Sequence, residues 1–439
     1  MLARPRKDTL ITISLAAALA CLASHPARTG PSLPYALTSA TPHGPPPPPA
    51  DQPTFNSDLP MEVCVPAPET WAGCKTIGRT PAPPPGIPLP ADGMWFVVPT
   101  VSGADKQTLE RIVKELKDKK ILGLSLANAT GIETENFSLF APLTDLKWLD
   151  LSGNDGLPEN LLPGMTNLVY LDISRTNSAN DTLRQLAGLT KLQTLDLGLN
   201  LEIDDEGLPT LAPLAGLKDL DLGGSGVAGP GLDVLQSFTQ LERLALDQCT
   251  ELDLAVALPK LVPLKNLHSL DLSFSSFDEH ELTGLAQLTQ LTALDLTNCA
   301  LTDAQLKPVA ALTGLATLNL ALNQITDAGL ALLKNLKGLT SLRLGGNPIT
   351  EAGLHHLKAL TLLKSLALSR VSIKTEEALE SLLPLKNLEF LDLSGNECVT
   401  DRTLEIVAKL PALKQLVVKS TRSPRRESTS SHRHAPAWR

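Results

Sequence analysis

Aspartate recurs at one position of a repeated Leu-x-Leu-like phrase, and such a row of carboxylates could hold a basic partner. The residue between the two apolar positions is aspartate in seven of thirteen copies: Asp150, Asp172, Asp196, Asp221, Asp271, Asp295 and Asp392. If the copies form neighbouring strands, these carboxylates lie about 5 Å apart. One interpretation is an acidic groove that steers and binds a basic protein or peptide. The alternative is that exposed aspartates only keep a strand face soluble, since charge runs are usually solvated.

Three aromatic residues stand two positions before an aspartate of this row. They are Trp148, Tyr170 and Phe390. Exposed aromatic side chains beside a polar track are typical interface anchors, so the row and these aromatics form the predicted partner-binding surface. Packing of Trp148 and Tyr170 against an N-terminal cap is the competing explanation.

The sequence offers little to a catalytic reading. The adjacent His355 and His356, and the stretch "DEHE" at 278–281, lack a second convergent set of metal ligands. The chain has no nucleophile elbow, phosphate loop, Cys-x-x-Cys pair or His-Glu-x-x-His motif. We therefore expect no catalytic residues, no metal site and no cofactor. The net charge of −9 also argues against a nucleic-acid partner.

The spacing of the aspartates comes from a repeat of mostly 24 residues. The phrase "NQITDAGL" at Asn323 returns as "NPITEAGL" at Asn347, inside the frame L-x-x-L-x-L-x-x-N-x-I. The asparagine position of this frame marks thirteen turns, spaced 22 to 26 residues apart: Ala129, Asn154, Thr176, Asn200, Ser225, Cys249, Ser275, Cys299, Asn323, Asn347, Val371, Asn396 and Thr421.

One copy predicts a strand, a turn and a short helix. "LATLNL" at 315–320 alternates apolar and polar residues as a strand does. Small polar residues at the marker position can hydrogen-bond the adjacent turn, so stacked copies predict a ladder. Thr326 or Asp327 can cap about two helical turns whose leucines share a face. One copy cannot bury its leucines, and stacking buries them.

This frame resembles that of the leucine-rich repeat family over residues 121–421, with about 13 repeats. The resemblance implies an α/β leucine-rich-repeat solenoid, with a curved parallel β-sheet on the concave face and short helices on the convex face. The "ITDAGL" phrase is similar to that of bacterial repeat proteins and of the substrate-binding part of F-box proteins.

The cysteines follow from this register. Cys249 and Cys299 lie two markers apart, about 10 Å, which is too far for a disulfide, so we expect buried thiols. Cys398 is expected in the core. Cys64 and Cys74 are the candidate disulfide pair, because export would permit disulfides.

The remaining segments predict targeting and linking functions. Residues 1–23 have the layout of a secretory signal, and "ALAC" ending at Cys21 resembles a bacterial lipobox, which makes Cys21 a lipidation candidate. Residues 24–100, rich in proline, predict a disordered spacer. Residues 101–120 predict a capping helix, and residues 422–439 a basic disordered tail.

We therefore expect an exported, monomeric, non-enzymatic scaffold that holds a protein or peptide on its concave face. It would be secreted or attached to the cell envelope, with membrane contact only through a lipid anchor. The alternative is an intracellular adaptor like the repeat part of F-box ubiquitin ligase subunits, although a Pro-rich segment stands where an F-box-like domain would precede the array.

Overall fold

The computed structural model describes residues 53–66, 74–90, 93–100, 103–129, 131–275, 277, 281–397 and 399–419. The proposed signal segment 1–23 with Cys21, the tail 422–439 and Cys398 lie outside the described residues. The chain divides into one unit formed by residues up to 100 with 121–125, and a second unit formed by 101–120 with the rest. In the described part of the chain, no helix has the length and apolar character needed to cross a membrane.

The described part of the first unit is a small β-structure. Strand β2 (Met61–Pro66) pairs antiparallel with β3 (Cys74–Thr80) and with β5 (Phe96–Pro99). Strand β5 pairs parallel with β6 (Gly123–Ser125), and β1 (Thr54–Phe55) pairs with β4 (Ile87–Pro88). The prediction of a disordered spacer is therefore wrong for these residues. Prolines end β2, β4 and β5, where a missing N–H costs little, and Met61 and Val63 are buried.

The Cys64–Cys74 disulfide stays a prediction, because Cys64 is buried and the side chain of Cys74 lies outside the described residues. The register of β2 and β3 sets Cys64 opposite Thr76 and Cys74 opposite Pro66. The two cysteines are therefore not cross-strand partners. The Cys64 sulfur lies 3.7 Å from the Thr76 hydroxyl.

The second unit begins with helix α2 (Lys106–Asp118), at the predicted place. The Asp105 side chain accepts a hydrogen bond from the Thr108 N–H, which caps its first turn. Leu109, Ile112 and Leu116 are buried on one face. The helical spacing of these apolar residues is the pattern from which the helix was predicted.

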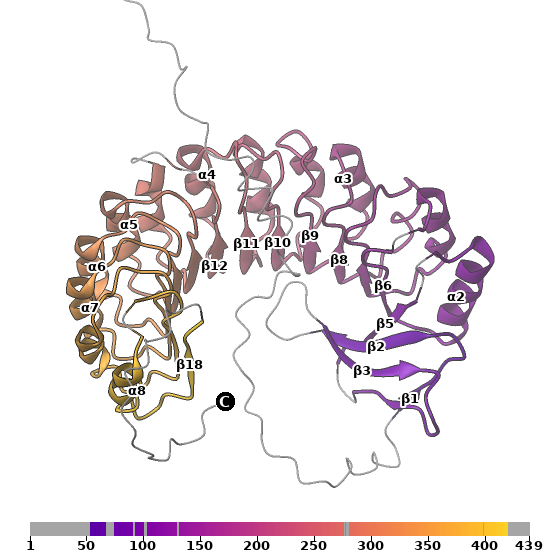
Figure 1. Cartoon of the computed structure of the whole chain (residues 1–439). Coiled ribbons are helices and arrows are strands. Elements are labelled where there is room, and N and C mark those ends of the chain that lie inside the picture. The colour runs from indigo at the N-terminus through magenta and orange to yellow at the C-terminus, as the bar shows by residue number, and fades with distance from the viewer. Residues whose placement is uncertain are drawn as a thin grey trace, which may run out of the picture. The chain divides into compact units, whose positions relative to one another are not determined.

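Twelve short parallel strands follow in chain order, each paired with the next. They are β7 (Trp148–Asp150), β8 (Tyr170–Asp172), β9 (Thr194–Asp196), β10 (Asp219–Asp221), β11 (Arg243–Ala245), β12 (Ser269–Asp271), β13 (Ala293–Asp295), β14 (Thr317–Asn319), β15 (Ser341–Arg343), β16 (Ser365–Ala367), β17 (Phe390–Asp392) and β18 (Gln415–Val417). Within this unit the strands line the inner side of an arc (Figure 1).

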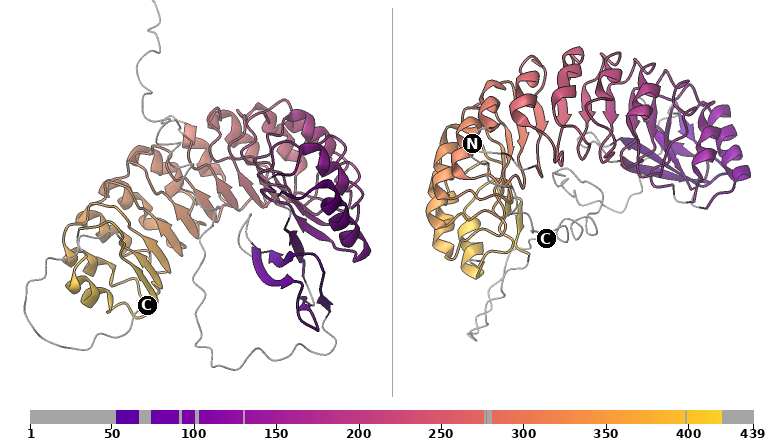
Figure 2. Two further views of the ribbon diagram at one scale, coloured as in Figure 1. Left: turned by 45° about the vertical axis from the view of Figure 1, so that its right-hand side comes forward. Right: turned by 90° about the horizontal axis from the view of Figure 1, so that it is seen from above.

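Short helical segments lie on the outer side of the same arc, as two further views show (Figure 2). They are η1 (Thr134–Phe140), α3 (Asn180–Leu186), η2 (Leu208–Leu211), η3 (Pro230–Ser237), α4 (Leu254–Leu261), η4 (Glu281–Gln287), η5 (Asp303–Gln305), α5 (Leu306–Ala310), α6 (Asp327–Leu332), η6 (Leu333–Asn335), α7 (Glu351–Leu357), η7 (Glu376–Leu382) and α8 (Asp401–Val407), where η denotes a 3₁₀ helix. The predicted solenoid fold is confirmed.

The predicted ladder of polar side chains is present at the asparagine markers, each of which donates to a carbonyl oxygen of the preceding repeat. Asn323 Nδ2 donates to the carbonyl oxygens of Leu296 (2.8 Å) and Leu320 (3.0 Å). Its Oδ1 accepts from the N–H groups of Cys299 and Leu301, both at 3.0 Å. One asparagine thus satisfies buried backbone groups of two repeats. At Ala129, which has no polar side chain, the neighbouring Asn154 Oδ1 accepts the backbone N–H at 3.0 Å.

The "ITDAGL" phrase is a clasp between consecutive repeats. Thr326 Oγ1 accepts from Ala328 N–H and caps its own helix. Asp327 reaches into the next repeat, where its carboxylate accepts from the Thr350 N–H (2.8 Å) and hydroxyl (2.6 Å). A Cβ on Gly353 would lie 2.2 Å from Asp327 Oδ1, so glycine makes room for the aspartate of the preceding repeat.

This clasp predicts a sign reversal at Gly353. Gly353→Ala should lower the free energy of unfolding by about 1–2 kcal/mol in the wild type, because the new Cβ displaces Asp327. In an Asp327→Ala background only Ile349 Cγ2, at 3.1 Å, stays close to the new Cβ. A shift of that side chain by a few tenths of an ångström lets the same change raise the free energy of unfolding by up to about 1 kcal/mol, since alanine favours helix more than glycine does. Denaturant titration of the four proteins measures both differences.

Gly188→Ala is the matched control, because no atom lies within 4 Å of a Cβ added there. An effect of the same sign at Gly353 in both backgrounds would contradict the clasp.

Candidate functional site

Two columns of side chains flank the buried leucine on the inner side of the strands. The first column contains Trp148 and the residues in register with it, and the second contains Asp150 and its equivalents. On β7 and β8, for example, Trp148 lies opposite Tyr170, and Asp150 opposite Asp172. The parallel register continues through β18. The aspartates of the predicted row therefore lie in one column. They occupy adjacent strands from β7 to β10 and again on β12 and β13.

Each aspartate of the second column binds its own backbone. In all seven, Oδ1 accepts a hydrogen bond from the N–H of the residue two positions later, at 2.8–3.0 Å: Asp150, Asp172, Asp196, Asp221, Asp271, Asp295 and Asp392. Asn319 does the same at 3.2 Å. An Asx side chain that bonds the chain two residues on fixes a turn, so these carboxylates shape the exit from each strand.

The expectation that this row points freely into solvent is wrong for part of it. Asp172, Asp196 and Asp221 are 2%, 6% and 2% exposed. Asp150, Asp271, Asp295 and Asp392 are half-buried. Both interpretations from the sequence placed these carboxylates on an exposed strand face. Each strand ends at its aspartate instead, and the side chain turns back onto the chain.

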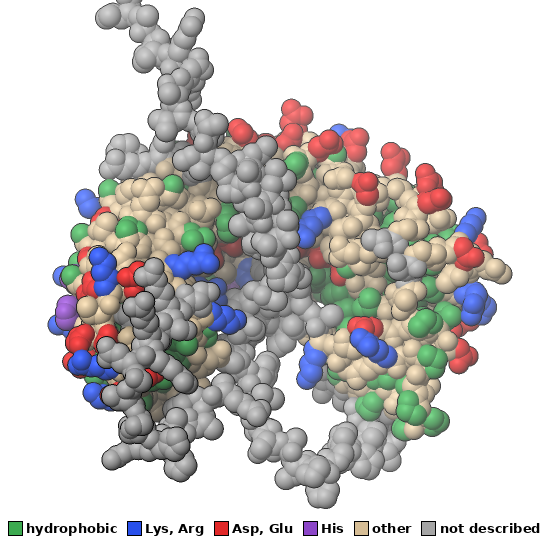
Figure 3. All heavy atoms as spheres, viewed as in Figure 1, with side chains coloured by type: hydrophobic (Ala, Val, Ile, Leu, Met, Phe, Trp, Pro, Cys, Tyr) green, Lys and Arg blue, Asp and Glu red, His purple; other side chains and the backbone are tan. Residues whose placement is uncertain are grey.

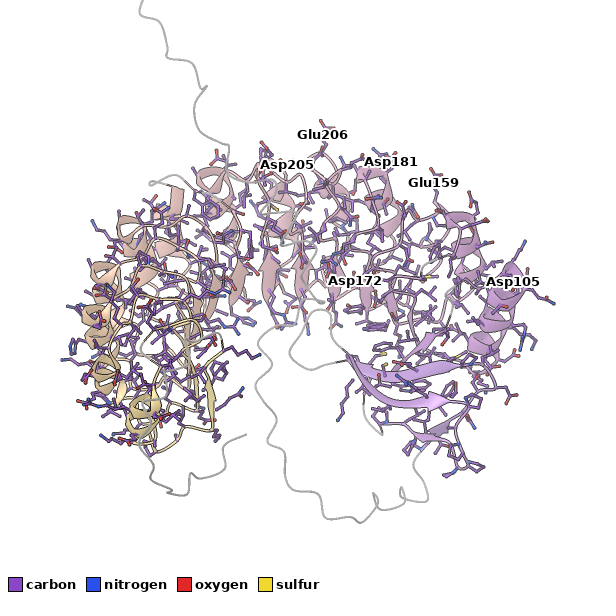
Figure 4. All side chains as sticks on the ribbon, in the orientation of Figure 1. Asp105, Glu159, Asp172, Asp181, Asp205 and Glu206 are labelled. Atoms are coloured by element: carbon purple, nitrogen blue, oxygen red, sulfur yellow. The ribbon has the colours of Figure 1, made fainter. Side chains whose placement is uncertain are left out.

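Exposed acidic side chains gather on the outer surface around α3 (Figure 3). Asp172 lies on the strand side of the arc, whereas Glu159, Asp181 and Glu206 lie on the helical side (Figure 4). The acidic character of the chain is therefore not concentrated on the inner face. A binding function for the aspartate row stays a prediction.

Burial and mutual repulsion perturb two members of the row. Burial, followed by the charge of Asp150, raises the pKa of Asp172 to about 7 against its hydrogen bonds to Ser174. Burial, followed by the charges of Asp295 and Asp247, raises the pKa of Asp271 to about 7. Like charges held about 5 Å apart at a poorly solvated surface disfavour ionisation.

The first column brings two of the three predicted aromatics together. The rings of Trp148 and Tyr170 stack with centroids 4.6 Å apart and an interplanar angle of 10°. Trp148 is 8% exposed and Tyr170 is half-buried. Burial and the neighbouring aspartates raise the pKa of the Tyr170 hydroxyl. Phe390 is half-buried on the distant strand β17 and joins neither ring.

An ion pair in the same column was missed at the sequence level. Arg243 Nε lies 2.5 Å from Asp219 Oδ1, on adjacent strands β11 and β10. Burial raises the pKa of Asp219, and Arg243 opposes that shift. The signal was available, since the two residues are 24 positions apart in the frame. The pair places the exposed guanidinium of Arg243 in the middle of the inner face.

The first column also differs most between repeats. From β7 to β18 its residues are Trp148, Tyr170, Thr194, Asp219, Arg243, Ser269, Ala293, Thr317, Ser341, Ser365, Phe390 and Gln415. The position that follows is leucine on every one of these strands. The fold therefore demands the leucine and accepts almost any side chain beside it.

The described cysteines of the array fit a structural role. Cys249 and Cys299 are buried, and each sulfur donates to a carbonyl of the preceding repeat, Leu222 at 3.3 Å and Leu272 at 3.2 Å. Burial raises the pKa of the Cys249 thiol to about 11 and that of the Cys299 thiol to about 12. Thiols with such pKa values are poor nucleophiles at neutral pH.

The possible metal-binding and catalytic side chains do not come together in the described part of the chain. In the part of the chain that the structure describes, no three His, Cys, Asp or Glu side chains converge as a metal site. His355 lies on α7, with its Nδ1 3.0 Å from the Ser381 hydroxyl. Residues 278–280 of "DEHE" lie outside the described residues, as does the side chain of Glu281. A shallow hollow of about 510 Å³ on the outer surface is lined by Asp205, whose carboxylate already accepts from Ala228, Gly229 and Gly231.

Comparisons with known proteins agree on the repeat. A family model described as "Leucine rich repeat" matches residues 289–349, and another described as "Leucine Rich repeat" matches residues 188–212. A curated relative, Tsukushi of Gallus gallus, is 31% identical over 155 residues. The match covers 34% of this chain and 41% of that relative, so the chain spans less than half of its length.

Solved structures with a similar course of the chain include an internalin (inlF) of Listeria monocytogenes. It is 22% identical with a TM-score of 0.48, over 73% of this chain and 89% of that one. The mouse RP105/MD-1 complex is 21% identical with a TM-score of 0.48, over 69% of this chain and 50% of that one. The TLR13–ssRNA13 complex is 24% identical with a TM-score of 0.47, over 68% and 43%.

The raised pKa values predict an acid-favoured fold. The pKa of Asp172 is about 7 in the folded state against an ordinary 3.8, so the folded state binds more protons between those pH values. The free energy of unfolding should therefore fall as pH rises from about 4 to about 8. Asp172→Asn keeps the turn hydrogen bond, as Asn319 does, and should raise that free energy at pH 8 by roughly 4 kcal/mol.

Denaturant titrations at pH 4, 6 and 8 measure this difference. At pH 4 the variant and the wild type should be equally stable. A constant difference at all three pH values would show that Asp172 is ionised throughout.

Proposed function

Because the chain is a leucine-rich repeat protein, we propose that it is a non-enzymatic scaffold whose inner face binds a protein or peptide partner outside the cytoplasmic membrane. The partner would lie across the strands and contact the first column of side chains. The second column and the buried leucines would hold the surface in shape beneath it.

The observation that carries this proposal is the contrast between columns within one chain. Thirteen copies of one unit act as an internal comparison, since each copy meets nearly the same neighbours. Positions that keep their residue type do so because the fold uses them: the leucines are buried, and all seven second-column aspartates bond their own turns. The first column varies from tryptophan to alanine without disturbing the register, so its side chains are available to recognise a partner.

The residue types in that column indicate which positions should contribute most binding energy to a partner. The stacked Trp148 and Tyr170 and the exposed Arg243 are the residue types that dominate binding energies at interfaces. Asp150, Asp271 and Asp295 are half-buried carboxylates beside them, which favour a partner with basic side chains. Between β13 and β16 the column carries small side chains that permit close approach.

A steric block on the inner face tests this. Thr317 and Ser341 are half-buried first-column residues, in register on β14 and β15. Thr317→Arg with Ser341→Arg should reduce capture of surface proteins from the native host by at least about tenfold, since two long cations would fill the space of the partner. Affinity capture on the full chain with quantitative mass spectrometry measures the loss.

Thr313→Arg is the control, because Thr313 is exposed in the loop before β14. It should capture the same proteins as the wild type. Equal capture by the blocked variant would remove the inner face from the proposal.

Export rests on the sequence of residues 1–23 and is tested separately. If Cys21 is lipidated, the mature chain begins at Cys21 and partitions into detergent, and Cys21→Ser moves it to the aqueous phase. Fractionation of host cells with intact-mass measurement distinguishes this from a signal peptide cleaved without lipid. A cytosolic chain that keeps its first residues would contradict export and favour the intracellular adaptor.

A further inference from the structure

The last repeat of the array exposes a leucine that earlier repeats bury. The phrase "VTDRTL" at 399–404 stands where two earlier repeats have "ITDAGL" and "ITEAGL". Leu330 and Leu354 end those earlier phrases, and they are buried in helices that pack against the helical segment of the next repeat. Among the described residues no helical segment follows α8, and Leu404 on α8 is 49% exposed.

The strand side of the same repeat has lost cover in the same way. Leu413 and Leu416 are half-buried. Leu388 and Leu391, which hold the same frame positions 25 residues earlier, are buried. We call Leu404, Leu413 and Leu416 the end face. Such a face needs a cover, because each repeat of a stacked array buries its leucines only against a neighbour.

Among the described residues, the array has a cover at its beginning and none at its end. Helix α2 precedes the first repeats and buries Leu109, Ile112 and Leu116. No helix or strand of the described residues follows β18. Residues 420–439 contain five arginines and a single large apolar residue, Trp438, so their composition is poorly suited to covering leucines. These observations favour a cover that comes from another chain.

One side of strand β18 is open as well. The Gln415 N–H donates to the Glu389 carbonyl at 3.0 Å, and the Val417 carbonyl accepts from the Leu393 N–H at 2.9 Å. Both residues therefore bond toward β17. Successive residues of a strand direct their backbone groups to opposite sides, so the N–H and carbonyl of Leu416 point away from β17. Strand β18 is the last of the sheet, and no strand of the described residues pairs with that side.

The open side of β18 lacks the features that protect most edge strands. Charged side chains and prolines on an edge discourage pairing with another chain. Residues 415–418 read "QLVV" and contain neither. By contrast β3, the other outermost strand of the sheet, carries exposed Lys75 and Arg79. Pairing with a further strand is therefore opposed by charge at β3 and unopposed at β18.

We propose that a second copy of this chain covers the end face, with its β18 paired antiparallel to the first β18 about a two-fold axis at Leu416. In that register the two Leu416 residues exchange both backbone hydrogen bonds. Gln415 lies opposite Val417 of the other copy, and Lys414 lies opposite Val418, so no two like charges meet along the strands. The end faces of the two copies bury each other beside the paired strands.

A second copy fits this edge because of symmetry. The same uncharged strand and the same uncovered leucines are present on both copies, so one surface satisfies itself. The chain is then a dimer, in place of the monomer expected from the sequence. This inference does not rest on the proposed function, since the inner face takes no part in the contact between the end faces.

Leu404→Glu tests the end face in the full chain. Sedimentation over a concentration series should show a dimer for the wild type. The variant should raise the dissociation constant at least about tenfold, because it places a carboxylate in an apolar contact. Leu362→Glu is the matched control: Leu362 is 50% exposed in the loop before β16, and its substitution should leave the constant unchanged.

An exchange of charges tests the strand register and controls for folding. One protein carries Gln415→Lys with Val417→Lys, and the other carries Gln415→Glu with Val417→Glu. Each protein alone sets like charges opposite one another and should sediment as a single chain. Their equimolar mixture should sediment as a dimer, which shows that both variants are folded and that the two positions face each other.

A wild type that stays a single chain at about 100 μM would overturn the proposal. If deletion of residues 420–439 then makes it dimerise, those residues cover the end face instead. A dimer that Leu404→Glu and Leu362→Glu weaken equally, or that the lysine and glutamate proteins each form alone, would also reject β18 as the contact.

Discussion

No repeat of this protein can satisfy itself, and that constraint shapes the rest of the structure. A single strand, turn and short helix exposes its leucines and leaves buried backbone groups without partners. Several polar side chains of the array therefore bond across a repeat boundary. Asn323 bonds to the preceding repeat and Asp327 to the following one. Gly353 has no side chain at the place that the Asp327 carboxylate occupies. The short phrase repeats because each copy is half of two contacts.

Much of this architecture could be predicted from the sequence, because periodicity reports burial directly. The leucine frame gave the strand order, the marker residues gave the ladder, and the pattern at 104–118 gave helix α2. The β-structure around Met61 and Phe96 was missed, since proline-rich composition masked short alternating segments whose prolines stand at strand ends. Composition describes a whole stretch, whereas strand pairing depends on a few residues brought together from distant positions.

The candidate site was half predictable for a related reason. Register placed Trp148 beside Tyr170 and Asp150 beside Asp172 correctly. Exposure was wrong for Asp172 and its neighbours, because the frame does not state where a strand ends. Three-residue strands put each aspartate at a turn, where its carboxylate finds a backbone N–H two residues on. A local hydrogen bond thus replaced solvent as the partner of the acidic row, and the row keeps its charge repulsion as a cost.

The two columns of the inner face therefore have different functions, one in maintaining the fold and one in the proposed recognition of a partner. The aspartate column is tied to the chain, so changing it disturbs turns and neighbouring charges together. The first column carries no such duty at most strands, and its side chains can change one at a time. Partner-binding residues can therefore change in the first column while the neighbouring aspartate column, which maintains the fold, stays the same.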